Sequence, residues 1–166
     1  LATGFLTEAG TVDAERCRKL RALLPTATLV FHKAFDATPD PDVSLRQLID
    51  CGFDRVLTSG GAPTAIEGVT VLNRLLVSAG GRIEILPAGG IRASNVIDLI
   101  EKTGCNQLHS AVREISDDSS IQHNLRLQFG LKGHDNGSYG RASVVQLEEL
   151  LKAVSHLRHP DPNGVS

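Results

Sequence analysis

His32 and Asp36 are the first side chains in the sequence whose types and spacing suit chemistry. They follow the apolar run 28–31, and in an extended chain His32, Ala34 and Asp36 would share one face. An imidazole beside a carboxylate can act as a general base with its orienting partner, or both can be metal ligands. The alternative is a buried pair that only stabilises the end of the strand. Lys33 would point to the other face unless the strand has ended, in which case its ammonium group could meet an anion.

Two glycine-containing turns follow later apolar runs and supply candidate anion-binding groups: Ser59, Gly60 and Gly61 in one, Gly89 and Gly90 in the other. Backbone N–H groups exposed by such turns, next to the start of a helix, can bind a phosphate or a carboxylate. The alternative is that these glycines only permit tight turns between a strand and a helix.

His109 ends a fourth short run, 107–110. If these runs are neighbouring strands of a barrel, His109 could face the same cavity as His32. Together with Asp36 the two histidines would form an incomplete set of metal ligands. The alternative is a histidine whose hydrogen bonds are satisfied within the core.

The three cysteines, Cys17, Cys51 and Cys105, are far apart in the sequence and form no CxxC motif. This spacing argues against a disulfide framework and a thiolate zinc site, and it suits a reducing compartment. We expect all three to be structural, since Cys51 and Cys105 lie at predicted helix ends beside glycines, away from the candidate ligand face.

The elements that must position these side chains alternate between short apolar runs and amphipathic segments. Strands are predicted over 28–31, 54–58, 82–86 and 107–110, and helices over 13–24, 41–51, 63–79 and 93–103. Such repeats imply parallel strands with right-handed crossovers, and ligand groups then lie at the carboxyl ends of the strands. A dinucleotide-binding sheet would carry a G-x-G-x-x-G turn, which is absent. We therefore predict an α/β fold of parallel (βα) repeats, a partial (βα)8 TIM barrel that lacks the N-terminal strands.

Length and composition support one domain. The chain has 166 residues, 41% of them hydrophobic and 22% charged, and residues 1–160 are predicted to form the C-terminal part of a single barrel domain. A polar loop is expected over 116–140, a last helix over 143–156 and a frayed tail over 161–166. Since a complete barrel needs about 250 residues, and since the sequence starts with Leu and has no Met, we interpret the chain as a fragment of a longer protein.

Charge and hydropathy exclude several classes of partner. A formal charge of -2 and a pI near 6.3 provide no basic field for nucleic acid or anionic lipid. The apolar runs are too short to cross a membrane, and no signal-peptide pattern begins the sequence.

Five segments carry a resemblance to a known family: GFLTEAGTVDAERC (4–17), FHKAFD (31–36), GFDRVLTSGGAPTAIEG (52–68), LPAGGIRASNV (86–96) and LHSA (108–111). In content and order they resemble the CutC family of copper homeostasis proteins. The resemblance implies a (βα)8 barrel and cytoplasmic copper handling through Cu(I) binding. It also implies roles for His32 and Asp36, in the family's FHRAFD motif, and for His109.

The sequence departs from the family at several points. Lys33 stands where the family has Arg, which keeps the charge but loses the bidentate fork, and Leu108 replaces an aromatic residue. The likeness fades after Ala111. The family's first strands, with the cysteines proposed to bind copper, have no counterpart in this chain, and Cys17, Cys51 and Cys105 are not their equivalents.

Three hypotheses on function follow. The first is a copper homeostasis protein that binds Cu(I), with His32, Asp36 and His109 as candidate ligands. The second is a barrel enzyme acting on a phosphorylated or carboxylated small molecule, with His32 as acid/base, Asp36 as its orienting partner and an anion at Gly89 and Gly90. The third is a chain that folds only with a partner, because unpaired strand edges invite homo-oligomers or self-association. Whether the protein is an enzyme stays open at this point.

Overall fold

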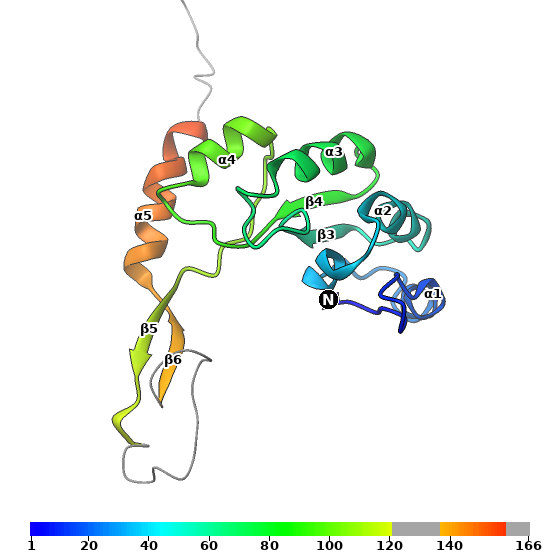
Figure 1. The fold of residues 1–166 in the computed structure, drawn as a ribbon, viewed down its shortest axis with the longest axis horizontal. Helices are drawn as coiled ribbons and strands as arrows, with labels where there is room; N and C mark the ends of the chain where they lie inside the picture. The colour runs from blue at the N-terminus through cyan, green and yellow to red at the C-terminus, as the bar shows by residue number, and fades with distance from the viewer. Residues whose placement is uncertain (121–136, 159–166) are drawn as a thin grey trace, which may run out of the picture. The chain divides into compact units, whose positions relative to one another are not determined.

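Four short parallel strands lie side by side in chain order in the first part of the protein, and Figure 1 shows the last two of them, labelled β3 and β4. They are β1 (Ala2–Thr3), β2 (Val30–Phe31), β3 (Arg55–Thr58) and β4 (Glu84–Pro87). The computed structural model describes residues 1–120 and 137–158, and it divides into two compact units, Leu1–Ser110 and Ala111–Ser166. The predicted α/β fold of parallel (βα) repeats is confirmed for the first unit.

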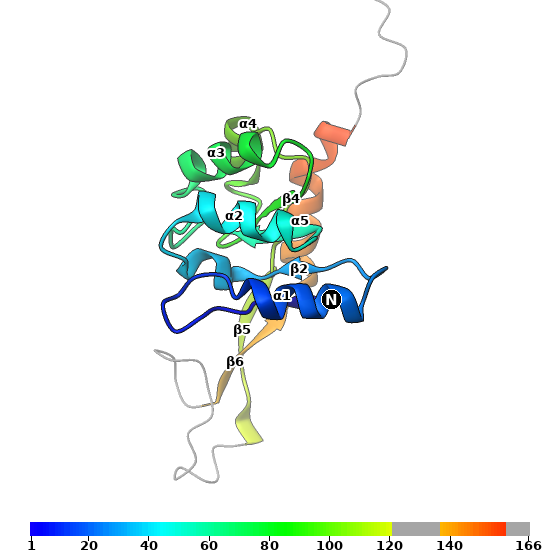
Figure 2. The same cartoon turned by 90° about the vertical axis from the view of Figure 1, so that its right-hand side faces the viewer.

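Helices connect the strands and pack against one another in chain order. They are α1 (Ala14–Leu23), α2 (Pro41–Asp50), α3 (Val69–Ala79) and α4 (Val96–Thr103). Figure 2 shows α1, α2 and α3 one after another beside the strands. This is the arrangement of consecutive units of a (βα)8 barrel, in which every strand ends at the same rim.

Local signals in the sequence set the helix ends. The Asp13 and Asp40 carboxylates cap the first turns of α1 and α2 by accepting hydrogen bonds from backbone N–H groups two or three residues on. Helices α3 and α4 end at Gly80 and Gly104, both in the left-handed conformation that glycine adopts most easily.

The core of this unit lies between the sheet and its helices. Along β3 the burial alternates, with Val56 and Thr58 fully buried and Arg55 and Leu57 partly exposed. Phe31 of β2 packs edge-on against Phe53, with ring centroids 5.6 Å apart. The largest fully buried side chains come from strands, helices and the loops between them: Phe31, Phe35, Leu29, Leu45, Leu48, Leu72, Leu75, Ile91 and Leu99.

The predicted fourth strand over 107–110 does not pair with β4 through a continuous series of hydrogen bonds. It is reduced to one isolated parallel bridge between Ala88 and His109, with the His109 N–H donating to Pro87 O at 2.8 Å. Helices α3 and α4 also begin later than predicted. Before α4, the Asn95 side chain stabilises a turn in place of the predicted first helical residues, because it accepts from the Arg92 N–H and donates to Gly90 O.

The second unit contains two strands where the sequence predicted a loop. Strands β5 (Arg113–Asp117) and β6 (Ser138–Ala142) pair antiparallel, and an Arg141–Glu114 ion pair of 2.7 Å joins them. The loop prediction over 116–140 is therefore wrong at both ends, because cross-strand pairing stabilises residues that are polar and half exposed. Its middle, and the predicted tail over 161–166, lie outside the described residues.

Helix α5 (Val144–Val154) follows, capped by the Ser143 hydroxyl, and continues into a 3-10 turn, Ser155–Arg158. None of the helices in the described ranges has the length and apolar character needed to cross a membrane.

Candidate functional site at the carboxyl ends of the strands

Strand β2 ends at Phe31, and residues 32–36 do not continue it in the extended conformation that the predicted pairing of His32 with Asp36 assumes. Directly after Phe31 it enters a 3-10 helix, Lys33–Ala37, for which His32 is the N-cap residue. A 3-10 helix has three residues per turn, so Lys33 and Asp36 come to one side. Their side chains form an ion pair with Nζ and Oδ2 3.1 Å apart.

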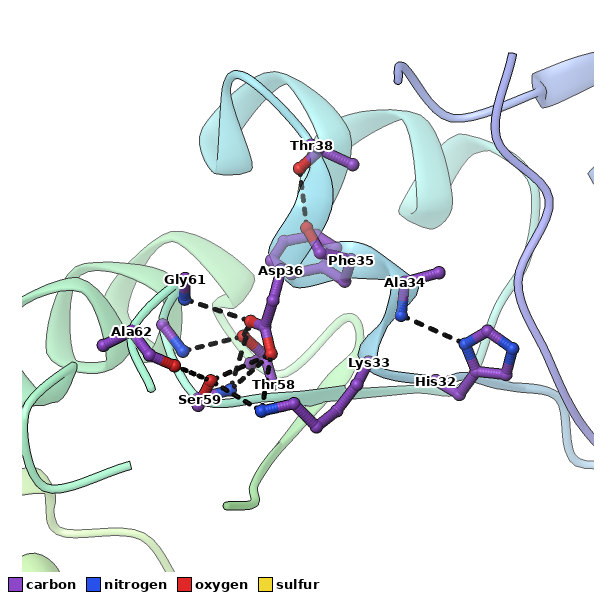
Figure 3. A network of polar contacts seen from close by, with 11 residues as sticks. His32, Lys33, Ala34, Phe35, Asp36, Thr38, Thr58, Ser59, Gly61 and Ala62 are labelled. Carbon is purple, nitrogen blue, oxygen red and sulfur yellow. Dashed lines mark hydrogen bonds and ion pairs between the residues drawn. The ribbon is translucent and has the colours of Figure 1, made fainter. Parts of the chain in front are cut away.

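His32 turns away from this pair (Figure 3). Its Nδ1 accepts a hydrogen bond of 3.1 Å from the Ala34 N–H, and its exposed ring lies against Gly4, where a Cβ would overlap Cε1. In the described part of the chain His32 makes no hydrogen bond to Asp36. The expected pair of general base and orienting carboxylate is therefore not formed, because the 3-10 turn replaces the alternation of an extended strand.

The Asp36 carboxylate is instead surrounded by donors from the end of β3. Oδ1 accepts from the Thr58 hydroxyl and from the N–H groups of Ser59 and Gly61, at 3.1 and 3.0 Å for the two N–H groups. Oδ2 lies 2.9 Å from the Ser59 hydroxyl, in addition to Lys33 Nζ. With both oxygens occupied, Asp36 has no lone pair positioned for a metal ion.

These contacts decide the charge of Asp36. Burial raises the pKa of the carboxyl, but the surrounding hydrogen bonds outweigh burial and hold the pKa below its ordinary value of 3.8. The donors that lower it are the Thr58 hydroxyl, the Ser59 and Gly61 N–H groups and the Lys33 ammonium. Asp36 is thus a charged residue at neutral pH whose role is to hold Lys33 and the 59–61 turn in place.

The two glycine-containing turns, alike in sequence, differ in the structure. In the first, the Gly60 N–H donates to Thr58 Oγ1 at 2.9 Å, and the Ser59 and Gly61 N–H groups donate to Asp36. This turn has no N–H group left for an anion, so the structure contradicts the prediction of an anion site at Ser59, Gly60 and Gly61.

In the second turn, the parallel bridge between Ala88 and His109 directs the Gly89 N–H toward His109 O, and the Gly90 N–H has no acceptor among the described residues. Both carbonyls are held, since Gly89 O accepts from the Ala65 N–H at 2.9 Å and Gly90 O accepts from Asn95 Nδ2 at 2.9 Å. Contacts to other elements therefore hold this turn, and the Gly90 N–H is the one that stays without an acceptor among the described residues.

The three predicted metal ligands do not assemble. Within residues 1–120 and 137–158 no three His, Cys, Asp or Glu side chains lie close enough together to hold a metal ion. Asp36 is saturated, and the proton of His32 is assigned to Nε2 because Nδ1 is an acceptor, which leaves that ring without a free lone pair. His109 is exposed, and its imidazole has no partner in the described ranges.

Sequence reasoning missed Thr58. The hydroxyl donates to Asp36 and accepts from Gly60, so it joins the end of β3 to the 3-10 turn. The available signal was its position: a buried polar residue at the last position of a strand, directly before a glycine turn.

The three cysteines lie where they were expected, in the interior. Their exposed fractions are 0%, 2% and 6% for Cys17, Cys51 and Cys105. Burial raises the pKa of the Cys17 thiol to about 12, and the neighbouring Cys51 and Asp13 add to the effect. A thiol held in its neutral form is a poor ligand and a poor nucleophile.

Comparison with known proteins places the chain in a family. Residues 1–114 match the CutC family. The chain belongs to the CutC family. A CutC family protein of Treponema denticola is 40% identical over 157 residues, which cover 95% of this chain and 63% of the relative. The copper homeostasis protein cutC homolog of Homo sapiens is 38% identical over 130 residues, covering 78% and 48% respectively.

A solved structure of CutC from Streptococcus agalactiae has the same fold over the matched region. The two chains align with a TM-score of 0.62 and 35% identity over 66% of this chain and 54% of the other. The family resemblance and the partial barrel predicted from the sequence are thereby confirmed. The chain spans about half to two thirds of the length of these CutC relatives.

Proposed function

We propose that this chain takes part in copper homeostasis in the cytoplasm, with Cu(I) as its cargo. The observation that carries the proposal is membership of the CutC family, two of whose mammalian members, from Homo sapiens and Mus musculus, are named copper homeostasis protein cutC homolog.

The geometry narrows the choice of Cu(I) ligands. Of the three ligands predicted from the sequence, Asp36 has both oxygens occupied, and His32 uses its Nδ1 lone pair for the Ala34 N–H. His109 is the one whose imidazole is free of partners in the described ranges. Neutral imidazole is an accepted ligand for copper, so we assign any Cu(I) contact in this unit to His109.

The test is anaerobic titration of the full chain with Cu(I), followed by the NMR signals of the histidine rings. We expect saturable changes in the His109 ring signals, loss of this binding in His109→Ala, and unchanged binding in His32→Ala as the matched control. No change in any histidine signal of the wild-type chain would show that this chain does not carry the cargo. Equal loss of binding in both variants would refute the assignment to His109.

The contacts of Asp36 do not support the enzyme hypothesis in the form that the sequence suggested. It required Asp36 to orient His32, whereas Asp36 is bound to Lys33 and to the end of β3. Self-association remains a prediction, since β1 has one hydrogen-bonded neighbour among the described strands, β2.

A further inference from the structure

We propose that helix α5 is an interaction surface that pairs with the same helix of a second copy of this chain, antiparallel and around a two-fold axis. The inference is independent of copper handling and rests on three observations in the second unit. Its apolar side chains are mostly exposed, the apolar residues of α5 have the spacing of a coiled-coil seam, and the seam and the charges beside it complement themselves in the antiparallel direction.

The described part of the second unit buries little apolar surface. In residues 111–120 and 137–158, Leu150 is the one apolar side chain that is buried. Seven large hydrophobic side chains there are exposed by 42% or more: Ile115, Tyr139, Val144, Val145, Leu147, Leu151 and Leu157. Four of the seven belong to α5, and exposed apolar side chains gathered on one element mark an interaction site.

Helix α5 is too short to be stable through its own contacts. It has 11 residues, and isolated helices shorter than about 12–15 residues are marginal in water. The Ser143 hydroxyl caps the first turn by accepting from the Gln146 N–H at 3.3 Å, which satisfies only one of the N–H groups at this end. A helix of this length depends on the packing of an apolar face, and the described residues leave Val144 and Leu151 68% and 47% exposed.

The spacing of the apolar residues indicates what packs on this face. Four of them recur at steps of three, four and three residues and so share one side of the helix: Val144, Leu147, Leu151 and Val154. We call these four residues the α5 seam. Side chains at this spacing insert between the side chains of a facing helix, so the occupant that fits the seam is another helix with an apolar stripe.

The order of the side chains in the α5 seam favours a second copy as this occupant. In both directions the seam reads Val, Leu, Leu, Val. Two antiparallel copies therefore place Val144 of one beside Val154 of the other, and the same register places Leu147 beside Leu151. A two-fold axis repeats each contact, which is the geometry of an isologous interface.

The charges beside the α5 seam fit the same arrangement. Glu148 and Lys152 lie on one flank of the seam, both are exposed, and neither has an ion-pair partner in the described residues. In the antiparallel register, Glu148 of each copy comes beside Lys152 of the other, and the two lysines offset the repulsion between the two glutamates at the axis. A parallel pair would turn this charged flank toward the opposite one, where Leu150 lies.

The first experiment is sedimentation equilibrium of the full chain over a range of concentrations. We expect a monomer–dimer equilibrium that Leu147→Gln weakens at least about tenfold, because each copy loses a buried leucine from the interface. Val77→Gln should leave it unchanged as the matched control, since Val77 is an apolar residue of α3 that is 83% exposed. A monomer at every concentration, or equal dimerisation of Leu147→Gln and wild type, would overturn the proposal.

The second experiment tests the register and separates loss of pairing from loss of folding. Glu148→Lys makes all the charges at the axis positive and Lys152→Glu makes them all negative, so each variant alone should dimerise at least about tenfold more weakly than wild type. A mixture of the two variants should recover the dimer, because each chain then faces opposite charges. A mixture that stays monomeric would overturn the antiparallel pairing. So would a monomeric wild type whose α5 amides are protected from hydrogen exchange, since another part of the same chain would then cover the seam.

Discussion

Replacing Asp36 by Asn is the most direct test of the contacts at the strand ends. The amide keeps one oxygen, which can still accept from Thr58 and from the Ser59 and Gly61 N–H groups. It puts an NH2 group where Oδ2 now faces Lys33, so donors meet donors there. The side chain of Asp36 is only 12% exposed, and water cannot replace most of what is lost.

The cost follows from the number and type of these bonds. A hydrogen bond to a charged acceptor contributes about 1.5–3 kcal/mol and a neutral one about 1 kcal/mol, so three bonds that lose their charge cost about 1.5–6 kcal/mol. Lys33 is partly exposed and can turn to solvent, so its ion pair adds little. With a urea m-value of about 2 kcal/mol per molar, the unfolding midpoint should fall by about 1–3 M.

The loss of stability caused by Asp36→Asn should also depend on pH, and it should shrink as the pH falls. The pKa of Asp36 lies below its ordinary value of 3.8 in the folded chain, so the unfolded chain binds more protons in acid. The stability that the carboxylate contributes is present above about pH 4 and is lost as the pH falls through the folded pKa. The gap between wild type and Asp36→Asn should therefore be full at pH 7 and shrink below pH 4.

Urea unfolding followed by circular dichroism measures both effects. Asp50→Asn is the matched control, because Asp50 is exposed at the end of α2 and its removal there should be neutral or slightly stabilising. Equal midpoints for the two variants, or a gap that persists unchanged at pH 3, would refute the role assigned to Asp36.

Three further predictions concern other parts of the first unit. Arg21→Lys should lower stability by about 1–2 kcal/mol in urea unfolding, because one guanidinium fork bonds Gly52 O and the Asp54 carboxylate at 2.6 Å each. Gly68→Ala should cost about 3 kcal/mol in the same assay, since its Cβ would overlap the Ser59 carbonyl oxygen. Cys17 should react with Ellman's reagent far more slowly in the native chain than in urea, because a pKa raised from 9.0 to about 12 reduces the thiolate on the order of a thousandfold.

Each of these has a result that would contradict it. For Arg21, it is an unchanged midpoint in Arg21→Lys. For Gly68, the control is Gly81→Ala, where a Cβ meets nothing within 4 Å and only the positive φ adds a cost of about 1 kcal/mol, so equal losses would exclude a clash. For Cys17, it is native reactivity equal to that in urea.

Much of the fold could be predicted because its signals are local. Apolar periodicity located the parallel strands and their helices, and the predicted starts at 13 and 41 lie within one residue of the observed starts of α1 and α2, which Asp13 and Asp40 cap. The predicted ends at 79 and 103 are those of α3 and α4, directly before Gly80 and Gly104. The second unit was less predictable, because β5 and β6 depend on pairing between distant residues.

The candidate site shows the limit of such reasoning. The sequence located the strand ends and their polar residues, but it paired the Asp36 carboxylate with the His32 ring. That pairing assumed an extended strand, since the residue types after Phe31 do not distinguish an extended strand from a 3-10 turn. Only the turn after Phe31 brings Lys33 to the carboxylate. Thr58 joined the site through a contact across 22 residues of chain.

The two glycine turns also differ in contacts that the local sequence does not determine. By itself the sequence determined that each would expose backbone N–H groups beside a strand end. The tertiary structure decided that Asp36 and Thr58 use those of the 59–61 turn, while the bridge to His109 engages the Gly89 N–H and the Gly90 N–H keeps no acceptor among the described residues. The physical reason is that the turn chemistry is local, whereas the acceptors that satisfy or spare an N–H group come from other elements of the fold.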